Sequence, residues 1–154
     1  MRSFGEADRK KKKARIQIRE NPEELSSELL SRLEDMVRAS TKDGHITCAL
    51  CFNIAKKVGV PRLAVGETAD RLGVRITDCQ IGCFKIDKTI HDNSDPKDCD
   101  DGIISKLVAL KANDDLTCLN VFGLAEQSKS TPRAIAGIAN NRNFRIRGCQ
   151  LGCF

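Results

Sequence analysis

The residues of this chain best able to do chemistry are its eight cysteines, because six of them recur in two sets at matching places. Thiolates bind zinc and iron–sulfur clusters and react with oxidants, whereas buried thiols pack as small apolar side chains. The sequence therefore leaves three roles open, namely core packing, metal or cluster binding, and redox sensing. The first set is Cys48, Cys79 and Cys83, and the second is Cys118, Cys149 and Cys153.

Two of the three cysteines in each set lie in a repeated C-Q-x-G-C-F segment. On a straight strand their sulfurs would lie ~13 Å apart, which is too far for one metal. A turn at Gly82 or Gly152 would bring each pair together, and Cys51 would give copy one a fourth sulfur. Copy two has no counterpart of Cys51, unless Cys99 reaches across. The chain requires no cofactor, but zinc or an iron–sulfur cluster would be held by Cys48, Cys51, Cys79, Cys83, Cys118, Cys149 and Cys153.

These cysteines belong to a longer internal repeat. Residues 46–84 and 116–154 align without a gap, with 13 identities in 39 positions, and the helical segment upstream repeats as well. A repeat longer than ~50 residues with its own helix and strand signals is a small domain. The expected division is a basic flexible arm at 1–22, repeat one at 23–84, an acidic linker at 85–101 and repeat two at 102–154.

Each copy predicts three helices followed by a strand. In copy one, Asn21–Pro22 has the residue types of a helix start. Thr47 can cap a second helix that ends at Gly59, and a third helix runs to about Leu72. Val74–Thr77 alternates apolar and polar residues, which is typical of a half-buried strand. Because units of this size are marginally stable alone, we expect the copies to pack on each other or to self-associate.

The middle of copy one resembles the helix-turn-helix superfamily. Ala55 is the small residue needed where two helices approach, and Gly59 tolerates the left-handed backbone of the turn. Copy two has Lys129 in place of that glycine, so its turn is either rebuilt around the following residues or kept without the usual motif. With the strand, the resemblance implies a mainly α fold with short β segments, in two tandem winged-helix-like three-helix domains. The residues that carry the resemblance are Ile54–Ala55, Val58–Gly59–Val60 and Val65.

The same resemblance implies binding to double-stranded DNA, with the third helix of each copy in the major groove. The charge distribution agrees, because the segment between Lys129 and Arg147 contains five cations and no acid, and residues 1–20 carry a charge of +5. Asparagine and arginine can read base edges, and the strand arginines can contact phosphates. The candidate DNA-binding residues are Arg62, Arg71, Arg75, Arg133, Asn140, Asn141, Arg142, Arg145 and Arg147.

The sequence contains none of the common catalytic motifs for phosphate binding, dinucleotide binding, zinc proteolysis or serine nucleophiles, so we expect no enzyme. It predicts neither a signal peptide nor a membrane span, and therefore a cytoplasmic protein whose cysteines are thiols or metal ligands. The leading hypothesis is a DNA-binding transcriptional regulator. The alternatives are a metal-binding, iron–sulfur or thiol redox-sensing protein that uses the repeated cysteines, and a helical protein–protein adaptor.

Overall fold

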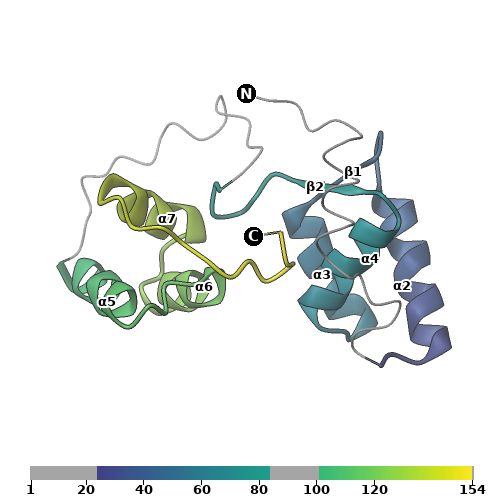
Figure 1. Ribbon diagram of the computed structural model, residues 1–154, viewed down its shortest axis with the longest axis horizontal. Helices are drawn as coiled ribbons and strands as arrows, with labels where there is room; N and C mark the ends of the chain where they lie inside the picture. The colour runs from purple at the N-terminus through teal and green to yellow at the C-terminus, as the bar shows by residue number, and fades with distance from the viewer. Residues whose placement is uncertain (1–23, 84–100, 154) are drawn as a thin grey trace.

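The computed structural model describes residues 24–83 and 101–153. Within these ranges the protein is mainly helical and forms two lobes, one from each repeat (Figure 1). The predicted basic arm, Cys99 and all of the predicted acidic linker except Asp101 lie outside the described residues. Repeat one contains α2 (Ser27–Ser40), β1 (His45–Thr47), α3 (Cys48–Val58), α4 (Arg62–Arg71) and β2 (Arg75–Thr77). Repeat two contains α5 (Asp101–Ala112), α6 (Cys118–Gln127) and α7 (Pro132–Asn141).

Hydroxyl side chains set the start of four helices by accepting a backbone N–H of the first turn. The predicted Thr47 cap is confirmed, since its side chain accepts the N–H of Leu50 at 3.3 Å. The predicted helix start at Asn21–Pro22 lies outside the described residues, and the described part of the chain begins its first helix later. Glu24 has a φ of +50°, and α2 begins only after the Ser26 cap. None of the described helices has the length and apolar character needed to cross a membrane.

The turn between the second and third helices is the same in both repeats. Gly59 has a φ of +77°, as its sequence position predicts, and Lys129 takes the equivalent place with a φ of +53°. In both turns the next residue donates its N–H to an alanine carbonyl, from Val60 to Ala55 at 3.1 Å and from Ser130 to Ala125 at 2.9 Å. Repeat two therefore keeps the turn without its glycine.

A short parallel β pair closes repeat one. The predicted strand after the third helix is present as β2, which pairs with β1 in a register that places Ile46 opposite Ile76. In repeat two the pair is reduced to a single parallel bridge between Thr117 and Arg147, at the position equivalent to Thr47 and Thr77. The described residues contain no antiparallel hairpin of the kind that forms a wing.

The last residues of each repeat pack into the core of the other repeat. We call Cys79–Cys83 hook one and Cys149–Cys153 hook two. Leu151 of hook two is 2 % exposed in the core of repeat one, and Ile81 of hook one is 1 % exposed in the core of repeat two. Figure 1 shows both segments crossing between the lobes, one after β2 and one after α7. The two repeats thus complete each other's cores.

Candidate thiol centre between the repeats

The turn expected in the repeated cysteine segment is present in both hooks. Gly82 and Gly152 have φ values of +75° and +76°, a left-handed backbone that favours glycine. Their N–H groups bond to the carbonyls of Cys79 and Cys149, at 2.9 and 3.0 Å. Each turn brings the two cysteines of its hook into side-chain contact. Cys79 and Cys83 are hydrogen-bonded to each other, and so are Cys149 and Cys153.

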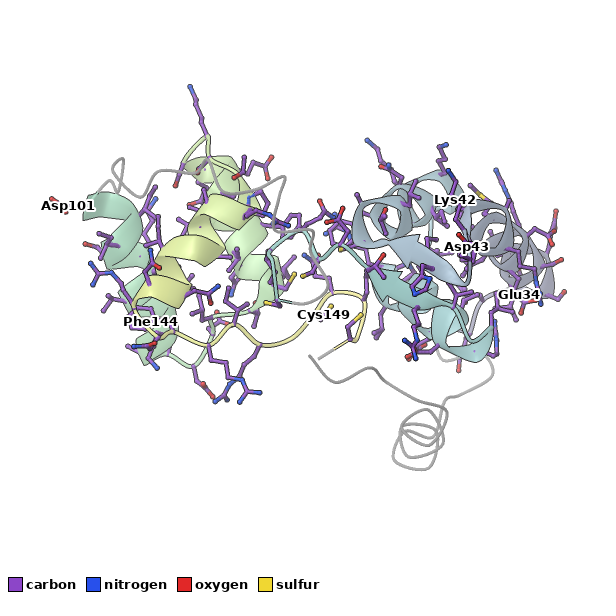
Figure 2. All side chains as sticks on the ribbon, turned by 90° about the horizontal axis from the view of Figure 1, so that it is seen from above. Glu34, Lys42, Asp43, Asp101, Phe144 and Cys149 are labelled. Atoms are coloured by element: carbon purple, nitrogen blue, oxygen red, sulfur yellow. The ribbon has the colours of Figure 1, made fainter. Side chains whose placement is uncertain are left out.

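Hook two stabilises a thiolate. The Cys153 thiol donates a hydrogen bond to the Cys149 sulfur, and this bond is the main cause that lowers the pKa of Cys149 to about 6. Burial opposes this shift, and backbone N–H groups of residues 151–153, which also donate to the sulfur, lower the pKa further. Cys149 is half-buried and lies between the two lobes, where sulfur atoms gather in Figure 2. It is therefore ionised near neutral pH and partly accessible, which are the two properties of a reactive cysteine.

Hook one has the same turn but a different environment. Cys79 is 3 % exposed, whereas Cys83 is exposed. The hydrogen bond to Cys79, followed by burial, raises the pKa of the Cys83 thiol above its ordinary value. In hook one the buried member of the pair is therefore Cys79, and the exposed member, Cys83, keeps its proton.

The cysteines at the helix starts are buried close to the hooks. Cys48 and Cys118 are 6 % and 5 % exposed, and burial raises the pKa of each thiol. The amide of Gln80 donates to the Cys48 sulfur and that of Gln150 to the Cys118 sulfur, both at 3.5 Å. Both thiols are part of the apolar cores, so they pack in the way of the first of the three roles that the sequence leaves open.

Cys51 differs from the other cysteines because repeat two has Val121 in its place. It is completely buried in the core of repeat one, and this burial raises the pKa of its thiol to about 12. Among the described residues, no three histidine, cysteine, aspartate or glutamate side chains are arranged to hold a metal ion. None of the seven described cysteines forms a disulfide.

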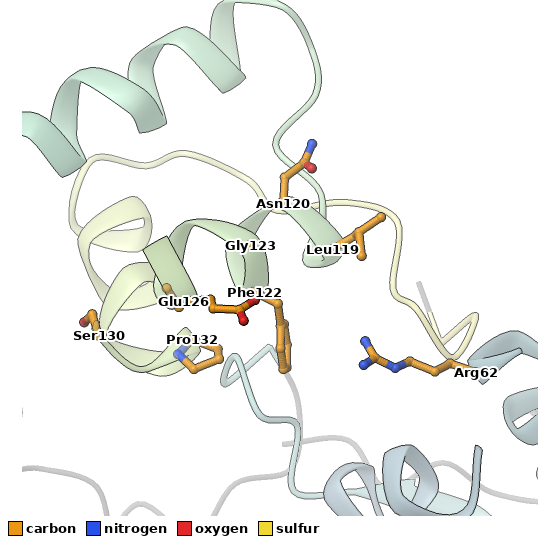
Figure 3. A pocket seen from close by; sticks show the side chains of 9 residues that line it. Arg62, Leu119, Asn120, Phe122, Gly123, Glu126, Ser130 and Pro132 are labelled. Carbon is orange, nitrogen blue, oxygen red and sulfur yellow. The ribbon is translucent and has the colours of Figure 1, made fainter. Parts of the chain in front are cut away.

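Phe52 and its repeat equivalent Phe122 meet where the two lobes touch. Their ring centroids are 5.3 Å apart and the rings are tilted by 41°. The Arg62 guanidinium lies 4.0 Å from the Phe52 centroid and donates a hydrogen bond to Gln150 of hook two. It also points toward Phe122 across an open pocket of about 520 Å³ (Figure 3). A second pocket of about 460 Å³ lies at the equivalent place in repeat one and includes Phe52 and Gln80.

The structure separates the candidate DNA-binding residues into two groups. Three arginines of the third helices are engaged within the protein. Arg62 binds Gln150, Arg71 pairs with Glu34 at 2.9 Å, and Arg133 donates to the Cys79 carbonyl at 3.0 Å. Arg75 is half-buried in β2, and Arg147 is exposed but lies 3.4 Å from Asp114. The remaining candidates form an exposed strip from the end of α7 onward, namely Asn140, Asn141, Arg142 and Arg145.

Comparison with models of known protein families, with curated proteins and with solved structures gives no match for this chain.

Sequence reasoning missed three contacts that join the repeats, and it assigned Arg62 to DNA instead. Gly66 lies against the Leu151 backbone, Phe52 against Phe122, and Arg62 against Gln150. A signal for two of these contacts was present, since the phenylalanine and the glutamine are among the 13 identities. Gly66 gave none, because repeat two has alanine in its place.

Proposed function

We propose that this protein is a thiol redox sensor in which the two cysteines of hook two interconvert between a dithiol and a disulfide. The observation that carries this proposal is the turn at Gly152, which holds the Cys149 sulfur against the Cys153 thiol and surrounds it with backbone donors. A stabilised thiolate beside a second thiol is the arrangement that reversible oxidation requires. The role is stoichiometric and cytoplasmic, and it requires neither a metal nor enzymatic turnover.

A hydroperoxide is the oxidant class that this pair can use. The Cys149 thiolate attacks one peroxide oxygen, the O–O bond breaks, and the leaving alkoxide takes a proton and departs as an alcohol. Cys149 is then a sulfenic acid. The Cys153 sulfur attacks it, an S–S bond forms, and the S–O bond breaks. Hydroxide leaves with the proton of Cys153 as water, so two thiols and a hydroperoxide give a disulfide, an alcohol and water.

Peptide mapping after hydrogen peroxide treatment tests this function. Cleavage after Arg147 releases a peptide that contains both cysteines of hook two, and cleavage after Arg75 and Lys85 releases one that contains both cysteines of hook one. We expect the hook-two peptide to be oxidised before the hook-one peptide, with a mass loss of two hydrogen atoms. An added external thiol should restore its original mass. Cys149→Ser should abolish this change, whereas Cys51→Ser, which removes a buried thiol with a pKa of about 12, should not. Equal oxidation of both hooks, or irreversible oxidation of hook two, would contradict the proposal.

We propose double-stranded DNA binding as a second function, favoured by the exposed strip Asn140, Asn141, Arg142 and Arg145. The two helical lobes would act as winged-helix-like domains of a transcriptional regulator. Because Arg62 and Arg133, at the starts of α4 and α7, bond to the hooks, DNA contact would fall on the end of α7 and the segment after it, rather than on those helix starts. Such a contact would supply phosphate neutralisation and asparagine or arginine readout of bases.

Fluorescence anisotropy with a random DNA duplex at two salt concentrations tests this second function. The double variant Arg142→Ala with Arg145→Ala should weaken binding and flatten its salt dependence, because two phosphate-neutralising charges are lost. The matched control is Lys56→Ala with Lys57→Ala, which removes two exposed cations from α3. If both double variants lose affinity equally, the strip has no special role, and the absence of wild-type binding at low salt would exclude the function.

A further inference from the structure

Hook two is seated against α4 of the other repeat at a position that only glycine allows. A Cβ placed on Gly66 would overlap the Leu151 carbonyl oxygen and would lie 2.7 Å from its carbonyl carbon. Real Cβ atoms do not approach backbone this closely, so any larger residue at position 66 must displace the hook. Repeat two has Ala136 at the equivalent position, where a Cβ is present.

This close approach fixes the direction of a donor to Cys149. The Leu151 carbonyl and the Gly152 N–H belong to one planar peptide unit and point in opposite directions. When the carbonyl oxygen is held against Gly66, the N–H on the other side is directed into the turn. There it bonds to the Cys149 carbonyl at 3.0 Å and also contributes to the stabilisation of the Cys149 sulfur.

Arg62 provides a second anchor for hook two, again from repeat one. Its guanidinium donates to the Gln150 side-chain oxygen and stacks on Phe52, while the Gln150 amide donates to Cys118. Gln150 therefore ties α4 of repeat one to α6 of repeat two. Hook one lacks this anchor because Pro132, which has no side-chain donor, stands at the position equivalent to Arg62.

We infer that repeat one controls the reactivity of the repeat-two dithiol, with Gly66 and Arg62 as positioning residues that hold the Cys149–Cys153 turn in its reactive geometry. This inference rests on the proposed redox function and assigns its regulation to the contact between the repeats. It also gives a reason for the tandem arrangement, since neither repeat contains both the reactive hook and its seat.

The pH dependence of Cys149 alkylation in the full chain tests the inference. Iodoacetamide is added under native conditions at pH 5 to 9, and modification of the peptide after Arg147 is followed by mass spectrometry. The wild-type rate should rise with a midpoint near pH 6, the pKa of the thiolate in its turn. In Gly66→Ala the midpoint should move up toward the ordinary thiol value of about 8.5, because the displaced turn weakens the hydrogen bond from Cys153 and misaligns the backbone donors.

Gly137→Ala is the matched control, since this α7 glycine has open space where a Cβ would be added. Its midpoint should stay near pH 6. The second variant is Arg62→Ala, which changes an exposed side chain and should fold. The midpoint of its Cys149 alkylation should also rise. It replaces Gly66→Ala as the test if circular dichroism shows that Gly66→Ala does not fold. Folded Gly66→Ala or Arg62→Ala protein with an unchanged midpoint would overturn the inference and leave the redox function standing. A wild-type midpoint near 8.5 would instead overturn the redox function itself.

Discussion

Cys149 and Cys79 occupy the same place in the repeated motif and yet differ in exposure. Both sit on a glycine turn and share a hydrogen bond with the cysteine four residues later. The difference comes from what each hook meets in the opposite repeat. Hook two packs against Gly66, and its Cys149 is half-buried. Hook one packs into the repeat that has Ala136 at the equivalent position, and its Cys79 is almost completely buried. The motif supplies the thiol pair, and its surroundings determine how far the first cysteine of the pair is exposed.

Lys129 is a second residue whose surroundings override its own preference. Its φ of +53° is a left-handed backbone that costs a residue with a Cβ roughly 1–2 kcal/mol. Lys129→Gly should therefore raise the free energy of unfolding by about 1 kcal/mol, after the larger chain entropy of glycine is subtracted. Urea denaturation followed by circular dichroism measures this change. Ser128→Gly is the control, because Ser128 has a φ of −92°, which any residue adopts. This substitution should lower the free energy of unfolding of the protein. A Lys129→Gly protein that unfolds at lower urea than wild type would contradict the argument.

At the scale of elements, the sequence predicts the caps, turns and strands whose formation depends on residues adjacent in the chain. The Thr47 cap, the Gly59 turn and the β2 strand were all predicted correctly, because each follows from a few adjacent residues. The start of α2 was placed too early because Asn21–Pro22 carries the same local signal as the Ser26 cap that the helix uses. Two competing caps cannot be ranked from local preference alone.

The exchange of the hooks could not be predicted in the same way. Ile81 and Leu151 would be buried whether each packed into its own repeat or into the other repeat. The pattern of apolar residues in the sequence is therefore the same for both arrangements. The choice depends on contacts between residues far apart in the sequence, such as Gly66 with Leu151. The exchange also explains why Arg62 and Arg133 could not be placed, since each bonds to a hook that no local signal puts beside it.

At the scale of the whole molecule, the two repeats act as the two halves of an internal dimer. Phe52 meets Phe122, two equivalent pockets lie beside them, and the hooks are exchanged in both directions. Full burial of a side chain such as Ile81 or Leu151 contributes roughly 1.5–3 kcal/mol relative to exposure. Each small repeat therefore gains part of its core from the other, which compensates for a size that is marginal for independent folding.

This mutual dependence predicts that the repeats stay associated when the chain between them is cut. A protease site inserted between residues 85 and 100 allows cleavage of the folded protein, and size-exclusion chromatography then reports whether the halves separate. We expect the cut protein to elute with the intact one at micromolar concentration, because both hooks remain seated. In Leu151→Ala, which should cost about 2–5 kcal/mol through the cavity left in the core of repeat one, the cut halves should separate on dilution. The uncut Leu151→Ala chain should still elute as one species, because its linker keeps the effective concentration of the repeats high. If the cut wild-type halves separate as readily as those of the variant, the hooks contribute little to holding the repeats together, and the control of Cys149 by repeat one loses its structural basis.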